Sequence, residues 1–427
     1  MSTKFFECSL AVMYRGRDHR GQVQGGPMYV VQNALPGWLK PLAIFFAVCG
    51  LVGTTALYTA NQTAGFFHSA YAQHSDRVVA SLFGDKLTLG IVLAALVTYI
   101  LLGGIKRLAS WTSALVPVMC LFYVGASLVV IAMHLDAVPE AFKSIFVKAF
   151  SPDAVIGGAE GTFVMVLING IKRSAFSNEA GVGTAPMAHS NAKTTEPVSE
   201  GLVAMLGPMI DTIIVCTMTA LVILVSVEPA DYVARKGVVL THYAFTENFG
   251  AWGTYGMTVA VALFGFSTMV GMANYNSKCF DFLFRDTLGG FGRWIFLAWF
   301  AFTLILGAAA PHDEMIMLID TAYGLMAIPT MMTTLILAPR VIHALRSYSG
   351  RHITGKPIET PKPQGGDGLP LLIFGVCVTL AVLADIVGTY VSHEDSWVHQ
   401  LPVGDAELWV LGVLGVASVL IGLAVRC

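Results

Sequence analysis

Long, uninterrupted apolar runs constrain the fold of this chain more than any other feature. A helix that crosses a bilayer needs about 20 mainly apolar residues, and ten stretches of the sequence approach that length and character. The runs are continuously apolar rather than alternating, so they predict helices and not the strands of a barrel. We therefore expect an all-α, polytopic membrane protein. The expected spans cover residues 41–67, 88–105, 112–134, 158–175, 202–227, 255–283, 292–309, 313–338, 369–391 and 407–425.

The composition favours the same class of protein. Of 427 residues, 55% are hydrophobic and 12% are charged, whereas an average soluble domain is roughly 25% charged. The net charge of −2 offers no basic stripe for a nucleic acid. The seven cysteines are scattered and form no CxxC pair, which indicates neither a zinc site nor a disulfide framework. We expect no cofactor and no nucleic-acid partner, and we expect membrane lipid around the chain.

The positive charges predict which loops face the cytoplasm. Lys and Arg concentrate in cytoplasmic loops, and nineteen of the 25 fall on one side when alternate loops are assigned to opposite sides. That side holds the loops at residues 15–40, 172–200 and 340–368. We expect a multi-pass protein of the plasma (inner) membrane with these loops in the cytoplasm. The Pro- and Gly-rich stretch 339–368 predicts a linker, and residues 369–427 predict a separate, peripheral pair of helices.

Three aspartates lie inside apolar runs, where an ionisable side chain is costly and indicates function. Asp211 lies near the middle of its run, Asp320 lies about a third of the way through another, and Asp385 lies in the run at 369–391. For Asp211 and Asp320 two interpretations stay open: an ion or proton pathway, or a carboxylate satisfied by neighbouring backbone and hydroxyl groups. For Asp385 we expect the second.

The segment 169–194, NGIKRSAFSNEAGVGTAPMAHSNAKT, places Ser, Asn, Glu and several glycines directly after an apolar run. Non-helical backbone at membrane depth occurs where it is buried in protein or lines a cavity. Broken helices of this kind form the binding sites of secondary transporters. The alternative is a plain cytoplasmic loop after the span, and composition alone does not separate the two.

Other polar or adaptable side chains lie in apolar surroundings. The adjacent hydroxyls of Ser267 and Thr268 suit a hard cation, which prefers oxygen ligands, although such hydroxyls commonly bond to the preceding helical turn instead. The amides of Asn61 and Gln62, in the stretch TANQT, suit either a zwitterionic substrate or interhelical hydrogen bonds. Met326 suits either an adaptable apolar pocket or ordinary core packing.

Together these segments resemble the sodium:alanine (alanine or glycine:cation) symporter family. The resemblance covers residues 1–338, and FSNEAG followed by GLVAML and IDT at this spacing is highly specific. The motifs that carry it are GGPMYV at 25–30, LGGIKRLA at 102–109, RSAFSNEAGVGTAP at 173–186, the following EGLVAMLGPMIDT, FGFSTMVG at 264–271 and DTAYGLMAIPT at 320–330.

The resemblance implies a LeuT-type fold of five plus five inverted repeats. Residues 1–338 would then form the transporter core, from the end of core helix 2 through core helix 10. The implied function is Na⁺-coupled symport, with H⁺ as the coupling ion in some members, of a small neutral amino acid such as alanine or glycine by alternating access. We see no GxGD or HExxH motif, so the chain is expected to be a transporter and not an enzyme.

Residue roles also follow from the resemblance. Ser267 and Thr268 become the implied Na⁺ ligands, and Glu179 becomes the carboxylate that fixes a helix break. Asp211 and Asp320 are implied structural or coupling carboxylates. Thr59 stands where the family has Gln, with Gln62 one helical turn later, which leaves open a substrate other than alanine. The implied substrate contacts are Phe176, Ser177, Asn178, Gly181, Thr59, Gln62 and Met326.

The family also places further core helices before the GGPMY loop. This sequence has only the stretch TKFFECSLAVMY there, which is too short to span a membrane and resembles the end of the family's second core helix. We therefore expect an N-terminally truncated core without the first broken helix. This leads to an alternative function, a non-transporting polytopic remnant or scaffold.

Overall fold

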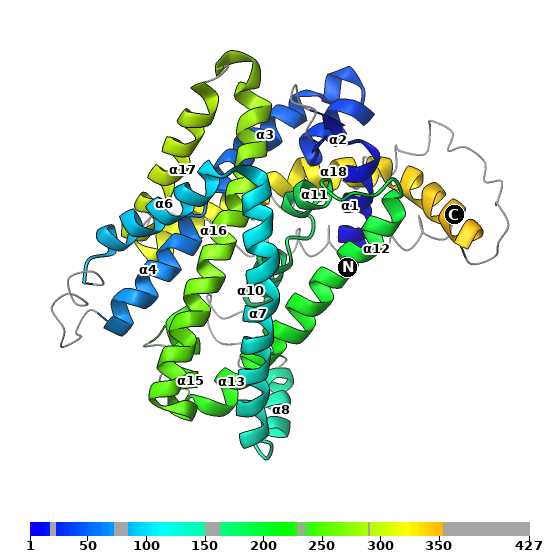
Figure 1. The fold of residues 1–427 in the computed structure, drawn as a ribbon. Helices are drawn as coiled ribbons and strands as arrows, with labels where there is room; N and C mark the ends of the chain where they lie inside the picture. The colour runs from blue at the N-terminus through cyan, green and yellow to red at the C-terminus, as the bar shows by residue number, and fades with distance from the viewer. Residues whose placement is uncertain are drawn as a thin grey trace, which may run out of the picture. The chain divides into compact units, whose positions relative to one another are not determined.

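Helices dominate the computed structural model of this chain (Figure 1). The chain forms two compact units, which we describe separately. Unit 1 comprises Met1–Gly53, Glu179–Gly207 and the chain from Asp320, and unit 2 comprises Thr54–Asn178 and Pro208–Ile319. The structure describes residues 1–17, 23–71, 84–149, 163–228, 232, 235, 237–288 and 291–352.

The described helices support the prediction of a polytopic, all-α membrane protein. Six segments are long and apolar enough to cross a membrane, and a shorter apolar helix covers Lys86–Leu102. The expected spans at 369–391 and 407–425, together with Asp385, lie outside the described residues. The six segments are Gly37–Tyr71, Val116–Met133, Pro197–Ser226, Ala251–Phe284, Gly292–Ala309 and Met315–Arg351.

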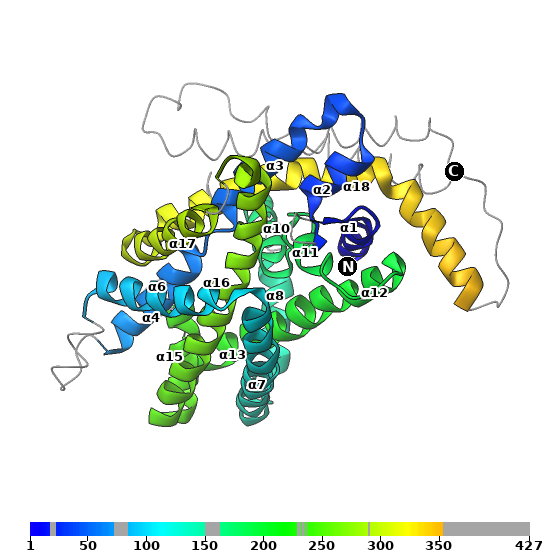
Figure 2. The same ribbon diagram turned by 45° about the horizontal axis from the view of Figure 1, so that its top comes forward.

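Unit 1 is built around α1 (Ser2–Met13), which contacts α2 (Pro27–Ala34) and α11 (Thr184–His189). Figure 2 shows these three helices beside one another. Small side chains allow α1 and α11 to approach closely, because Cys8 and Ala185 form a buried cluster with Ala204 of the later helix Pro197–Pro208. The short apolar stretch before the first basic loop is therefore a buried helix of this unit.

The remaining helices of unit 1 extend from this centre. After α2, the chain passes through the 3₁₀ turn η1 (Gly37–Leu39) into α3 (Pro41–Gly53). On α12 (Pro197–Pro208), a Cβ added to Gly201 would lie 2.9 Å from the backbone oxygen of Phe5, so only glycine permits this helix to approach α1 so closely.

The long helix α18 (His312–His352) begins in unit 2 and enters unit 1 at Asp320. It continues to His352, past residue 338, where the hydropathy pattern predicts the end of the span and the start of a linker. Pro329 and Pro339 lie inside the helix, and neither ends it.

The described residues include one small β-sheet, which is a two-stranded hairpin. It pairs β1 (Gly16–Arg17) with β2 (Val23–Gln24) in antiparallel register. Pro27 begins α2 shortly after it, at a position where the missing N–H of proline costs the helix no hydrogen bond. The expected loop at residues 15–40 therefore contains regular structure.

Unit 2 contains the greater number of described helices. Many of them pack through small residues: a Cβ on Gly307 would lie 2.6 Å from Leu57 Cα, and one on Gly90 would lie 3.2 Å from Ile305 Cα. Its elements are α4 (Leu57–Tyr71), α6 (Lys86–Leu102), α7 (Gly104–Met133), α8 (Val138–Ala149), α10 (Phe163–Asn178), the π-helix η2 (Met209–Cys216), α13 (Thr217–Ser226), α15 (Val238–Phe249), α16 (Ala251–Leu288), α17 (Gly292–Ala309) and the first turns of α18.

Packing in unit 2 centres on α16 and α17. α17 contacts α6 and α4, and α16 contacts α15, α7 and α4. A buried cluster that includes Phe66, Val222 and Phe245 joins α4, α13 and α15. Close interhelical packing through small residues is the usual way in which membrane helices associate, because lipid supplies no hydrophobic drive between helices.

Candidate functional site

The helix break predicted in segment 169–194 is present, between the end of α10 at Asn178 and the start of α11 at Thr184. Three residues in this interval have positive φ: Glu179 at 56°, Gly181 at 82° and Gly183 at 97°. Two of them are glycine, which adopts such angles without a steric penalty. The segment is therefore an ordered turn rather than a frayed helix end, and it requires partners for its exposed backbone groups.

Glu7 of α1 supplies the first of these partners. Its carboxylate accepts a hydrogen bond from the Gly181 N–H, with both oxygens 3.2 Å from that nitrogen. The side chain is 2% exposed. Glu7 was not among the predicted site residues, although a carboxylate inside the apolar stretch TKFFECSLAVM is a signal for such a role.

Thr330 of α18 supplies the second partner. Its hydroxyl is placed to donate to the Val182 carbonyl at 3.3 Å and to the Met326 carbonyl one turn earlier at 2.9 Å. A Cβ on Gly183 would lie 2.5 Å from Thr330 Oγ1 and 2.6 Å from Phe46 Cε2. The break is thus held from two helices that lie far from it in sequence.

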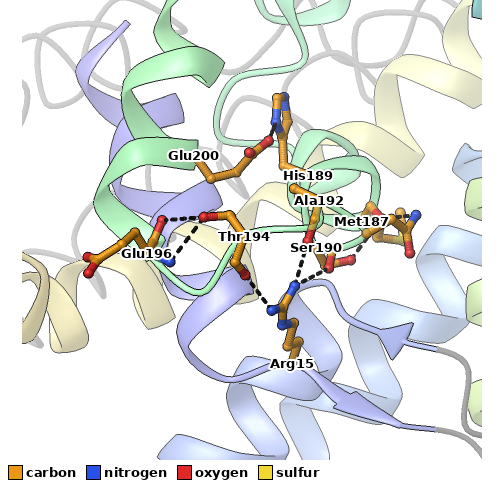
Figure 3. A network of polar contacts seen from close by, with 9 residues as sticks. Arg15, Met187, His189, Ser190, Ala192, Thr194, Glu196 and Glu200 are labelled. Carbon is orange, nitrogen blue, oxygen red and sulfur yellow. Dashed lines mark hydrogen bonds and ion pairs between the residues drawn. The ribbon is translucent and has the colours of Figure 1, made fainter.

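The chain that follows α11 is held by Arg15, just beyond the end of α1. Figure 3 shows its guanidinium directed at the backbone of this chain. It donates to the carbonyls of Ser190 at 3.4 Å, Ala192 at 2.8 Å and Thr194 at 2.6 Å. These are carbonyls at and beyond the C-terminus of α11, which the helix itself leaves unpaired and which attract a cation.

A side-chain hydrogen bond joins the same region to α12. His189 Nδ1 lies 2.6 Å from Glu200 Oε1, and both side chains are mostly buried (Figure 3). An exposed pair, Arg351 with Glu196 at 3.0 Å, lies nearby. The interval from Glu179 to Glu200 therefore has specific side-chain partners along its length, all within unit 1.

Two further predicted residues lie on α18 in unit 1. Met326 is fully buried, and a Cβ on Gly53 would lie 2.7 Å from its sulfur. This close packing matches the alternative that treated Met326 as core. Asp320 is partly buried at the point where α18 enters the unit. Their implied substrate and coupling roles stay predictions.

In unit 2, the predicted residues Ser177 and Asp211 contact each other. Ser177 Oγ donates a short hydrogen bond to Asp211 Oδ2, and Thr212 Oγ1 donates to the same oxygen at 3.3 Å. Asp211 belongs to the π-helix η2, a rare conformation that is frequent at functional sites. Neighbouring hydroxyls therefore donate hydrogen bonds to the Asp211 carboxylate, which agrees with one of the two interpretations left open from the sequence. A role of Asp211 in coupling stays a prediction.

Phe176 and Asn178 lie on the last turn of α10. The Phe176 ring meets Tyr58 of α4 edge-on at 5.3 Å between centroids, and the Arg173 guanidinium lies 5.6 Å from the Phe176 centroid. Asn178 Nδ2 donates to Ser174 Oγ at 3.2 Å. α10 is thus fixed to α4 by an aromatic contact just before the chain breaks.

The adjacent hydroxyls of α16 point in different directions, because successive helical residues are about 100° apart. Ser267 is buried, and its hydroxyl lies 3.1 Å from the Phe264 carbonyl and 3.7 Å from Met119 Sδ. Thr268 is exposed. The bond from Ser267 to its own helix is the alternative anticipated from sequence, and its oxygen lone pairs remain available to a cation.

The amides of α4 link helices. Asn61 Nδ2 donates to the Gly307 and Ala310 carbonyls, at 2.9 and 2.7 Å, where α17 ends. Gln62 Nε2 lies 2.6 Å from His312 Nδ1, and Gln62 Oε1 accepts from Val238 N at 3.5 Å. Of the two roles proposed for these amides, the structure shows the interhelical one. Thr59 is partly buried on the same helix.

We expect Asn61→Ala to lower stability, because it removes the donor that serves two carbonyls at the end of α17. An unsatisfied buried polar group costs about 1–3 kcal/mol. The measurement is the melting temperature of the purified protein in detergent. Asn33→Ala is the matched control, since Asn33 also donates an amide hydrogen to a backbone oxygen, at 2.9 Å from the Tyr14 oxygen, but is exposed. An equal drop in both variants would contradict the capping role.

Comparison with known proteins gives the family. A model of the sodium:alanine symporter family matches residues 1–361. An uncharacterized transporter of Haemophilus influenzae is 37% identical over 82% of this chain and 74% of its own length. The sodium/alanine symporter AgcS of Methanococcus maripaludis is 35% identical over 82% and 74%. The probable sodium/glutamine symporter GlnT of Bacillus subtilis is 30% identical over 83% and 70%.

These matches span both compact units and include every motif from GGPMYV to DTAYGLMAIPT. Together with the apolar helices, they show a multi-pass membrane transporter rather than an enzyme. The chain belongs to the sodium:alanine symporter family.

Proposed function

We propose that the chain carries out Na⁺-coupled symport of a small neutral amino acid, such as alanine or glycine, across the plasma membrane. The family supports cation-coupled amino-acid symport, and relatives are named as alanine and glutamine symporters. None of these names favours the alternative of a non-transporting remnant. The resemblance further supports a LeuT-type arrangement of five plus five helices with the loops at 15–40, 172–200 and 340–368 in the cytoplasm.

The observation that carries the proposal is the ordered helix break between Asn178 and Thr184. A break of this kind frees backbone N–H and C=O groups, which suit the carboxylate and ammonium of an amino acid. The proposed substrate contacts beside it are Phe176, Ser177, Asn178 and Gly181, with Thr59, Gln62 and Met326 as further contacts. Glu179, with its positive φ of 56°, is proposed to fix the break.

The proposed Na⁺ ligands are Ser267 and Thr268. Hydroxyl oxygens suit a hard cation, and two of them without a carboxylate favour Na⁺ over H⁺ as the coupling ion. Na⁺ couples to transport only if it binds one conformation better than the other, because a ligand with equal affinity for both shifts nothing. The amino acid must prefer the same conformation for the two to move together.

The test is uptake of labelled alanine, glycine and glutamine into proteoliposomes under an inward Na⁺ gradient, with choline replacing Na⁺ as the reference. We expect uptake that requires Na⁺ and is saturable by a neutral amino acid. A folded protein that takes up none of these substrates would instead support the alternative function, a non-transporting remnant. Uptake driven by a pH gradient without Na⁺ would assign H⁺ as the coupling ion.

Ser267→Ala combined with Thr268→Ala is expected to raise the half-saturating Na⁺ concentration at least tenfold. A tenfold change corresponds to a loss of about 1.4 kcal/mol of binding free energy, which the removal of two ligands is expected to reach. Ser277→Ala is the matched control. Ser277 lies on the same helix, and its hydroxyl bonds to the carbonyl three residues earlier, at 2.9 Å from the Asn274 oxygen, as Ser267 does to Phe264. If both variants behave alike, the sodium assignment is wrong.

A further inference from the structure

A small cavity in unit 1 has one strongly polar wall. It lies among α1, α2, α11 and α18 and holds about 10 Å³, close to the roughly 10–15 Å³ that a single water-sized guest occupies. Its polar wall consists of Glu7, Thr330, Thr333 and Thr334, and its apolar wall includes Leu10 and Val30. No motif that sequence analysis used includes this set.

The helical register explains why these hydroxyls meet. Thr330, Thr333 and Thr334 are spaced i, i+3 and i+4 on α18, so they lie on one face of the helix. Glu7 approaches from α1 and adds two carboxylate oxygens. The wall therefore offers five side-chain oxygens, two of them from a carboxyl group, which is a hard-ligand set.

One of these groups, Thr333, lacks the partner that its burial requires. Thr333 is 2% exposed, and none of the described residues forms a hydrogen bond with its Oγ1. Glu7 is equally buried and accepts a hydrogen bond from the Gly181 N–H. A buried polar group without a partner is costly, and burial of an ionisable group such as Glu7 adds to that cost.

The charges around the cavity favour a cation over neutral water. Glu179 is close enough to repel the Glu7 carboxylate electrostatically. Lys4, one turn earlier on α1, attracts it but is not among the residues that line the cavity. A water molecule would satisfy the hydroxyls, whereas a cation of similar size would satisfy the hydroxyls and also stabilise the ionised form of the buried Glu7 carboxyl.

We propose that this cavity binds one monovalent cation, Na⁺, at the oxygens of Glu7, Thr330, Thr333 and Thr334. The site is distinct from Ser267 and Thr268, which belong to unit 2. It deepens the proposed function, on which its role in coupling rests. Two of its ligands also hold the helix break, since Glu7 accepts from Gly181 N and Thr330 donates to Val182 O, so an ion there acts directly on the conformation of the break.

The experiment measures Na⁺ binding without requiring transport. The melting temperature of the purified full chain is followed while NaCl replaces choline chloride at constant ionic strength, because a ligand that binds only the folded state raises it. The background is Ser267→Ala/Thr268→Ala, which removes the other proposed site. We expect this background to keep a saturable Na⁺ response, and Thr333→Val in it to raise the apparent Kd at least tenfold.

Matched variants separate an effect on Na⁺ binding from a general effect on the stability of the protein. Thr333→Ser restores a hydroxyl and is expected to restore the Na⁺ response. Thr303→Val removes another buried hydroxyl, one that donates to the Phe300 carbonyl at 2.8 Å within its own helix, and is expected to leave the Kd within twofold. In choline alone, Thr333→Val is expected to melt no lower than its background, because it removes an unsatisfied hydroxyl without changing the side-chain shape.

Two results would overturn the inference. One is a background variant that has lost all response to Na⁺, which would mean that a single cation site exists. The other is an unchanged response in both Thr333→Val and Glu7→Gln, which would mean that the cavity holds water. Uptake is assayed in parallel, so a chain that binds Na⁺ through Thr333 and imports nothing would refute the proposed function while the site stands.

Discussion

Replacing Gly183 with alanine is expected to destabilise the protein by about 2–4 kcal/mol and to abolish uptake. An alanine at its φ of 97° adopts a left-handed conformation that costs on the order of 1 kcal/mol or more. The new methyl would also lie 2.5 Å from Thr330 Oγ1, 2.6 Å from Phe46 Cε2 and 2.7 Å from Pro27 Cγ. Overpacking of a filled site typically adds about 1–3 kcal/mol.

The three neighbours of Gly183 cannot all move away to make room for the added methyl group. The ring of Phe46 is fully buried, Pro27 is part of the first turn of α2, and the Thr330 hydroxyl is held by its bond to Val182. The measurement is the melting temperature of the purified protein, together with Na⁺-driven uptake. Gly271→Ala is the control, because Gly271 lies in α16 with no heavy atom within 4 Å of an added Cβ.

Alanine at Gly271 is expected to be neutral or to stabilise the protein slightly, since alanine favours a helix over glycine by up to about 1 kcal/mol. A Gly183→Ala protein with the melting temperature of the wild type and with unchanged uptake would contradict this prediction. It would show that the chain around the break can shift to accept the added methyl group. The contrast between the two glycines isolates backbone geometry and space from the general effect of adding a methyl group.

Arg15→Ala is expected to lower stability by about 2–3 kcal/mol, because hydrogen bonds to a charged group contribute about 1.5–3 kcal/mol each when buried and less when partly exposed. The change removes three donors from the carbonyls of Ser190, Ala192 and Thr194 (Figure 3). Hydrogen exchange is expected to quicken in residues 184–194 before other parts of unit 1. Uptake is expected to fall with it.

Arg351→Ala is the control for Arg15→Ala. Arg351 also pairs with this segment, through Glu196 at 3.0 Å, but both side chains are more than a third exposed. Exposed ion pairs contribute about 0–1 kcal/mol, so this variant is expected to be close to the wild type. If the two arginine variants had equal effects, the three carbonyl bonds of Arg15 would not be what stabilises the segment.

Both predictions concern one property of the molecule. The chain from Glu179 to Glu200 follows α10, and it is held by α1 at Glu7 and by Arg15 beyond that helix, by α12 at Glu200 and by α18 at Thr330. If this segment binds substrate as proposed, alternating access requires it to adopt a small number of defined positions. Partners from distant parts of the chain provide that definition.

Much of the fold follows from local pattern. Continuous apolar runs identified the helices that are long enough to span a membrane, because a backbone in lipid must satisfy its own hydrogen bonds and a helix does so within one segment. The glycines and the sequence SNEAGVG indicated where α10 ends, because positive φ angles require residues that tolerate them. The family motifs, each confined to a dozen or so residues, identified the class of transporter.

What the sequence by itself determined is therefore the polytopic, helical class of the protein and its family. Only the tertiary structure decided which side chains hold the break and which oxygens meet in a cavity. Glu7 and Gly181 are 174 residues apart, and Thr330 and Val182 are 148 apart. The physical reason is that helical periodicity assigns each residue to a face, whereas its partner depends on which helices pack together, and that is set by the whole chain.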